Sequence, residues 1–292
     1  MYLPKKPFMS ICSWALILLM GSWVSVYAFA GMSESETKAE RRPQLEQFII
    51  HYTNEVRAKH GLKSLQHDPQ LESISRKHSD DMIRRNYTAH ITPEGLNPKD
   101  RISRYYRSFI GKISENIWLL SGSWKGVPYN QSSSPITMAK RIVDEWMQSP
   151  PHRQNILTEG LTHIGIGVSV SSGKMLVTQL LTQKIARFTE PVPLESTPGN
   201  MLGISVEFDI KNTKYLIGFE NLNPSNNSDK YQYIQKASTI RLPRETGSYR
   251  IVVLLEDGQR YNIFKGPSII INNGDNQQTG PLSSRINQTG TE

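Results

Sequence analysis

Two histidines and one glutamate stand in segments that could support metal or acid–base chemistry. His90 ends the run NYTAH, Glu115 lies in SENIW, and His152 follows two prolines in SPPHRQNIL. Neutral imidazole nitrogens and a carboxylate suit Zn²⁺ or another divalent metal, and a glutamate beside a bound water can act as a general base. The three residues come from separate segments, so only folding can bring them together. Their spacing makes them a candidate metal site and no more.

The turn that carries His152 is expected to be rigid. Pro150-Pro151 should end the helix predicted for residues 135–147, because proline lacks a backbone donor and restricts the residue before it. An imidazole directly after such a stop can point into a cleft. Three neighbouring polar residues are expected to support the site: Arg153, Asn155 and Asn116. Their hydrogen bonds would fix the turn or hold the second ring nitrogen that a metal-binding histidine leaves free.

The segments around these residues predict a mixed domain of helices and strands. Helices are expected after Pro43, after Asp68-Pro69, and for residues 98–106 and 135–147; strands are expected for residues 114–120, 162–170 and 175–183. In the strand 162–170, isoleucines and valines alternate with Gly165, Gly167 and Ser169, which predicts one buried face and one exposed face. His78 lies on an apolar helix stripe and is expected to pack in the core. The fold class is α+β.

The C-terminal part changes character. Residues 188–200 are proline-rich and predict a linker after a domain at 44–187. Only short strands are expected beyond it, at 201–210, 214–219, 231–236, 248–256, 260–264 and 268–271. Such strands, with a hairpin turn at Glu256–Gly258, predict a small all-β, sandwich-like domain over 201–272. Residues 273–292 are polar and predict a disordered tail.

The N-terminus has the features of an export signal. In residues 1–30, Lys5-Lys6 precede a long apolar run, and Ala28–Ala30 offers a small-residue cleavage site. The alternative is an uncleaved membrane anchor, because the run nears the length that spans a bilayer. Residues 31–43 predict a flexible linker. Cys12 is the only cysteine, so the mature chain would be cysteine-free, and a periplasmic or extracellular location is expected.

The net charge and the absence of several motifs limit the classes of function that this protein could have. The net charge of +8 is a mild basic excess that favours anionic envelope polymers or lipid headgroups. Lysine and arginine form no dense run with interleaved aromatics, which argues against nucleic acid as a partner. The HExxH, P-loop, GxSxG and paired CxxC motifs are all absent.

Four motifs in a fixed order resemble a known family. HSDDMIRRNYTAH, SENIW, EWMQSPPHRQNIL and THIGIGV, spread over about residues 44–183, are similar to the bacterial branch of the CAP superfamily. That superfamily includes cysteine-rich secretory proteins, insect antigen 5 and plant pathogenesis-related proteins. The resemblance implies an α-β-α sandwich with a large central cleft, and it places His90, Glu115 and His152 in that cleft. Animal and plant members have a second cleft glutamate where this chain has Ser149, so three ligands remain.

Three functions stay open. The first is an exported, cleft-based binding module for a lipid, an envelope component or a protein partner, with a candidate divalent-metal site. The second is a metal-dependent hydrolase of peptides or cell-wall material, with the two histidines holding the ion and Glu115 as third ligand or catalytic base. The third is a structural adhesin that uses the β-domain. Contact with a membrane is expected only through an uncleaved signal.

Overall fold

The computed structural model describes residues 38–122, 134–171, 173–208, 214–225, 230–235 and 239–274. The chain has two compact units, Met1–Arg41 and Arg42–Glu292, and of the described residues only 38–41 belong to the first. The predicted signal at 1–30 and the tail from residue 275 lie outside the described residues. Within these ranges, no helix combines the length and apolar character needed to cross a bilayer.

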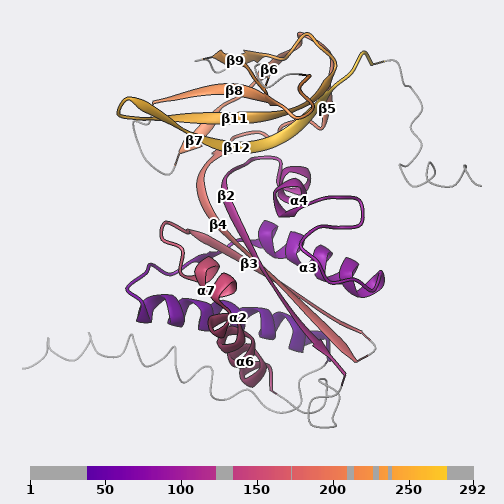
Figure 1. The fold of residues 1–292 in the computed structure, drawn as a ribbon, viewed down its shortest axis with the longest axis vertical. Helices are drawn as coiled ribbons and strands as arrows, with labels where there is room; N and C mark the ends of the chain where they lie inside the picture. Colours follow the sequence, from indigo (N-terminus) through magenta and orange to yellow (C-terminus); the bar gives the residue numbers. More distant parts are fainter. Residues whose placement is uncertain are drawn as a thin grey trace, which may run out of the picture. The chain divides into compact units, whose positions relative to one another are not determined.

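The first half of the second unit alternates helices and strands (Figure 1). Its helices are α2 (Lys38–Lys59), α3 (Pro69–Arg84), α4 (Pro98–Tyr105), α6 (Pro135–Gln148) and α7 (Pro150–Ile156). Its strands are β1 (Gln66–His67), β2 (Phe109–Ser121), β3 (His163–Ser171) and β4 (Lys174–Phe188), in the sheet order β1-β3-β4-β2. Helix α2 contains Pro43 and begins at Lys38, inside the segment predicted to be a flexible linker.

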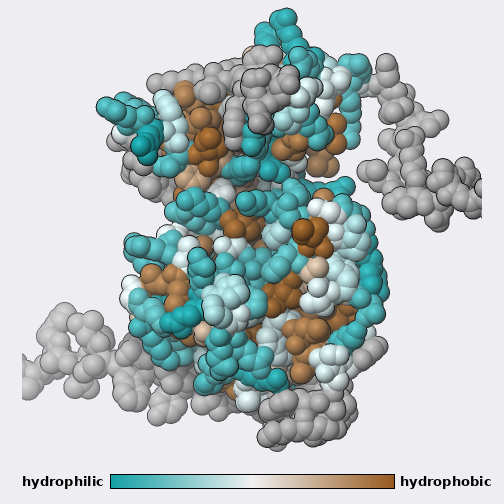
Figure 2. Space-filling view, in the orientation of Figure 1, coloured by the Kyte–Doolittle hydropathy of each residue, from teal (hydrophilic) through white to brown (hydrophobic). Residues whose placement is uncertain are grey.

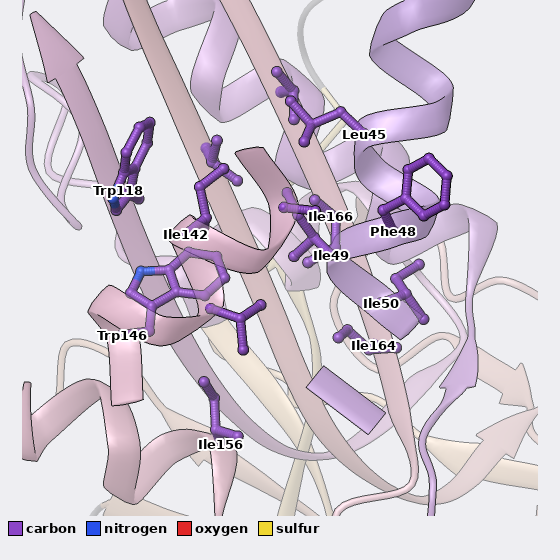
Figure 3. Close-up of a cluster of buried hydrophobic side chains, with 14 of the residues drawn as sticks. Leu45, Phe48, Ile49, Ile50, Trp118, Ile142, Trp146, Ile156, Ile164 and Ile166 are labelled. Atoms are coloured by element: carbon purple, nitrogen blue, oxygen red, sulfur yellow. The ribbon is translucent and has the colours of Figure 1, made fainter. Parts of the chain in front are cut away.

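Two apolar clusters make this half a three-layer sandwich. One cluster joins α2, α6 and α7 to the sheet, and Figure 3 shows Leu45 and Phe48 of α2 and Trp146 of α6 in it. The other cluster joins α3 and α4 to the sheet through Leu71, Ile102 and other residues. Alternate residues of a strand point to opposite faces, which is why β4 supplies both clusters. The predicted α-β-α sandwich is confirmed.

Strand β3 is buried on both faces, so the predicted half-exposed strand was wrong. The glycine face packs against α3, where a Cβ at Gly167 would lie 2.0 Å from the backbone nitrogen of Arg76. Ser75 and Ser79 of α3 donate hydrogen bonds to the carbonyls of Gly165 and Gly167, at 3.1 and 2.8 Å. The glycines therefore mark a close approach of two backbones, which alternation with small residues does not distinguish from exposure.

Among the described residues, the elements of the C-terminal part are strands. Its strands are β5 (Glu195–Ser196), β6 (Met201–Gly203), β7 (Val206–Phe208), β8 (Tyr215–Asn221), β9 (Tyr231–Gln235), β10 (Thr239–Arg241), β11 (Gly247–Asp257) and β12 (Arg260–Ile271). Strands β12-β11-β8-β9 continue the main sheet, and β10 pairs with β6 in a separate two-stranded sheet. Ile240 and Leu202 of the small sheet pack against a cluster that contains Ile251 and Phe219, so the predicted sandwich-like arrangement is confirmed.

The two parts share one ten-stranded sheet. Strand β2 pairs with β12 at a single register position, Gly111 opposite Lys265. The predicted linker 188–200 contains β5, which pairs with β12. Residues 260–264 and 268–271, predicted as two strands, form the single strand β12. Hydrophilic residues cover much of the face drawn in Figure 2 and separate smaller hydrophobic patches.

Candidate functional site

Glu115 is buried at the centre of the candidate site. It lies on β2, on the face that packs toward α4, and its side chain is 2% exposed. One carboxylate oxygen, Oε1, lies 2.9 Å from Nδ1 of His90. The other, Oε2, accepts a hydrogen bond from the guanidinium of Arg101. A buried carboxylate is stable only with such partners, because leaving water costs it several kcal/mol.

Arg101 connects the glutamate to the loop that carries His90. Its side chain is 5% exposed, and Nη1 donates to the carbonyls of His90 at 2.7 Å and Leu96 at 3.0 Å. Helix α4 places it there, and the helix start is fixed by a capping box in which Asn97 and Asp100 bind each other's backbone. One arginine therefore holds both the acid and the histidine loop.

His90 is the exposed member of the pair. Its side chain is 52% exposed, although Nδ1 is held by Glu115. The hydrogen bond to Glu115 raises the pKa of His90 above its ordinary value, against a smaller opposing effect of burial. Within the described ranges, Nε2 of His90 has no hydrogen-bond partner. The ring can therefore carry a proton and offer an N–H group to solvent or to a ligand.

His152 lies in the first turn of α7, which corrects the predicted turn. Helix α6 ends at Gln148, and Pro150-Pro151 then begin α7, because the first turn of a helix does not need their missing N–H groups. The His152 ring is half-buried and forms no hydrogen bond with the part of the chain that the structure describes. Burial, and then the charge of His90, lower its pKa below the ordinary value.

Two asparagines attach α7 to β2. Nδ2 of Asn155 donates to the carbonyl of Glu115 at 3.1 Å and to Oδ1 of Asn116 at 2.8 Å. Nδ2 of Asn116 donates to the carbonyl of His152 at 3.2 Å and to Gln179 at 2.9 Å. These bonds fix the backbone around Glu115 and His152 and leave the His152 ring free. Arg153 instead lies 3.2 Å from Nε2 of His60 on the surface.

His78 is buried in α3 behind the loop that carries His90. Its Nε2 lies 3.0 Å from the carbonyl of Ala89, the residue before His90. Burial lowers the pKa of His78 to about 4, so the ring is neutral at pH 7 and Nε2 must donate to that carbonyl. Among the described residues, Nδ1 of His78 and Nε of Arg101 have no hydrogen-bond partner. The predicted core position of His78 is observed.

The proposal that His90, Glu115 and His152 bind a divalent metal stays a prediction. Both oxygens of Glu115 are already engaged, one by a permanently charged arginine. In the described part of the chain, no group of three or more His, Cys, Asp or Glu side chains could hold a metal ion. The structure places His90 and Glu115 in direct contact, and it holds the backbone of His152 to β2 through Asn116, the neighbour of Glu115.

Sequence patterns did not predict the role of Arg101, which holds both Glu115 and the loop that carries His90. Glu115 stands in a strand in which Ile113 and residues 117–120 are apolar, and a carboxylate buried in such a strand needs a cationic partner. The run NPKD predicts that a helix starts after Asn97, which places Arg101 about one turn into that helix. This helix start is the only local signal for the position of Arg101. Nothing in either segment shows that the two meet.

Comparison with known proteins identifies the class of this domain. Residues 50–181 match the model of the CAP family, described as the Cysteine-rich secretory protein family. With the motifs and the three-layer fold, this match shows that the chain carries a CAP-family domain. The resemblance found in the sequence is confirmed for that domain, and the residues after 181 lie outside the match.

Two relatives come from Bacillus subtilis (strain 168). The chain is 32% identical over 123 residues to the uncharacterized membrane protein YlbC, a match that covers 42% of this chain and 31% of that protein. It is 31% identical over 140 residues to the uncharacterized protein YkwD, covering 47% and 46%. The chain thus spans less than half the length of either relative.

Two solved structures are also similar to this chain. One is an extracellular protein containing a SCP domain from Bacillus anthracis str. Ames, at 27% identity and TM-score 0.41, covering 52% of this chain and 45% of that one. The other is a cysteine-rich secretory protein from Staphylococcus aureus subsp. aureus Mu50, at 18% identity and TM-score 0.36, covering 52% and 44%.

Proposed function

We propose that this protein is an exported binding module whose CAP domain takes an anionic group of an envelope component between His90 and His152. The observation that carries the proposal is the engagement of Glu115 by Arg101 and His90. The glutamate acts as a fixed anchor that orients the His90 ring, and Nε2 of that ring, which has no partner among the described residues, is the group that would meet a ligand.

The charges around the site favour an anion. Arg101 and Glu115 compensate each other, so protonation of His90 gives the site a net positive charge. An imidazole N–H donates well to phosphate or carboxylate oxygens, and a charged donor about doubles the strength of such a bond. His152 adds a second ring without an acidic partner. The chain's net charge of +8 would raise the local concentration of polyanions.

A metal-dependent hydrolase is less well supported by this arrangement. It would require Glu115 to bind the ion or to take a proton from water, and a general base must reach that proton directly. The side chain is 2% exposed and its oxygens are occupied. For the adhesin alternative, based on strands β6 to β12, the described residues of those strands offer no cluster that favours it.

Binding of a phosphate-rich polymer tests the proposal. Calorimetry with short poly(glycerol phosphate) chains should show an affinity that falls about tenfold in His90→Gln/His152→Gln, as expected for the loss of one to two kcal/mol. The matched control is His51→Gln, because His51 is also exposed and also contacts a glutamate, Glu55. Equal affinity in wild type and the double variant would overturn the proposal.

A zinc titration separates binding from metal chemistry. Wild type and His90→Ala/His152→Ala should take up Zn²⁺ equally weakly. A tight site in wild type that disappears in the variant would instead support the hydrolase. Export is a separate part of the proposal, and N-terminal sequencing of the mature protein tests it: cleavage after Ala30 is expected, and an intact Met1 in membrane fractions would indicate an anchor.

A further inference from the structure

A cavity of about 380 Å³ lies where β2 and α4 meet β12, and its lining includes neither His90 nor His152. It exists because β2 and β12 pair at only one register position, Gly111 opposite Lys265, so the two strands separate on either side of it. Gly111 allows the close approach of β2 to β4, since a Cβ there would lie 2.2 Å from the carbonyl oxygen of Gln183. This volume falls in the range of small-molecule pockets.

The charge of the cavity lining is positive. Four basic residues line it, and no acidic residue is among the described lining residues: Lys99, Lys112, Arg250 and Lys265. Two of the four are neutralised from outside the cavity. Arg250 pairs with Asp100 at 3.0 Å, and Lys265 pairs with Glu220 at 2.9 Å.

The other two basic residues keep their charge for a ligand. Lys99 and Lys112 are exposed and form no ion pair with the described residues. Nζ of Lys112 lies 5.7 Å from the ring centre of Phe264, a contact that holds the chain near the cavity without neutralising it. The cavity therefore has two available positive charges at its edge.

The remaining lining is mainly apolar. Ile102, Phe109 and Leu161 are buried, and Ile113 is half-buried beside them. Ile263 on β12 is 43% exposed, which is unusual for a large apolar side chain that borders a cavity. This lining suits a ligand that has an apolar chain and a negatively charged head group. The chain leaves water for the apolar surface, and the head group pairs with the lysines.

We infer that this cavity is a binding site for an amphipathic anion, a short acyl or alkyl chain that ends in a carboxylate or phosphate. The apolar chain lies against Ile102, Phe109 and Ile263, and the head group pairs with Lys99 and Lys112. The site is independent of the histidine pair, because none of the lining residues is His90, Glu115 or His152.

Calorimetry on the full chain with four ten-carbon probes below their micelle concentrations tests this site. Decanoate and decyl phosphate should bind with one-to-one stoichiometry, whereas decanol and decyltrimethylammonium should bind at least about tenfold more weakly. Binding of decanoate alone would identify a carboxylate ligand, and binding of decyl phosphate alone would identify a phosphate ligand. Equal binding of decanol, or no binding of either anion, would overturn the inference.

Two variants locate the binding. Lys99→Gln/Lys112→Gln should weaken binding of the anionic probes at least about tenfold, as expected for losing two charge-assisted contacts. Lys59→Gln/Lys63→Gln is the matched control, since it removes the same charge from two exposed lysines outside the cavity. Ile263→Ser should weaken the binding of both anionic probes severalfold. The protein should stay folded, because the side chain of Ile263 is exposed. Unchanged affinity in the lysine double variant would contradict the site.

Discussion

The side chains of Arg101 and Glu115 form a buried ion pair, with 5% and 2% of their surfaces exposed. The pair joins α4 to β2 and holds His90 from two sides, through its ring and through its carbonyl. Several of the expected properties of this domain follow from it.

Removing one partner of this pair should destabilise the fold strongly. In Glu115→Gln the guanidinium of Arg101 stays buried without a counter-charge, and the expected loss is about 3–5 kcal/mol of unfolding free energy. Urea denaturation measures it. The exposed pair Lys140 and Asp144 is the control, and Asp144→Asn should cost less than about 1 kcal/mol. Similar small losses of unfolding free energy in Glu115→Gln and Asp144→Asn would contradict the burial of the charge on Arg101.

His90 should stabilise the fold only at lower pH. Its pKa in the folded state is raised by Glu115, so the contribution is complete below about pH 6.5 and is lost as the pH rises through the folded pKa. The unfolding free energies of wild type and His90→Gln should therefore differ most at acidic pH and converge at alkaline pH. A difference that grows with rising pH would contradict the sign of the shift.

His78 should have the opposite pH dependence. Its folded pKa of about 4 lies below the unfolded value, so its contribution is present above about pH 6.5 and is lost as the pH falls toward 4. A shift of this size corresponds to about 3 kcal/mol. Between these pH values, wild type should lose about that much more stability than His78→Gln. Parallel losses in the two proteins would indicate that His78 titrates normally.

The close contact between α3 and β3 predicts that one added methyl group strongly destabilises the fold. In Gly167→Ala the new Cβ would meet the backbone nitrogen of Arg76, and backbone cannot move aside as a flexible side chain can. Thermal denaturation should show a loss of about 3 kcal/mol or more. Gly203→Ala is the control, because a Cβ there meets nothing within 4 Å, and its effect should stay within about 0.5 kcal/mol.

The sequence predicted most helices and strands of the CAP domain, because each depends on local patterns, whereas their three-layer arrangement was implied by the family resemblance. Apolar spacing placed α2 and α3, and Ser134-Pro135 marked the start of α6. The double proline was ambiguous, since proline ends one helix and equally begins another. Here it did both, and His152 moved from a turn into α7.

The failures concern contacts between distant segments. Gly165 and Gly167 appeared to mark an exposed face because a missing side chain looks the same whether water or a helix lies beside it. The partner of Glu115 was not predicted, because Arg101 reaches it only through the fold. The pairing of Gly111 with Lys265 joins strands separated by about half the chain, and no local pattern indicates it.

The most direct test of the account is a histidine-selective NMR titration of wild type with and without short poly(glycerol phosphate). The signals of His90 and His152 should shift together on binding, the pKa of His90 should rise further because an anion favours the charged ring, and His51 should stay unchanged. Polymer binding that leaves the signals and pKa values of His90 and His152 unaltered would contradict the proposed function.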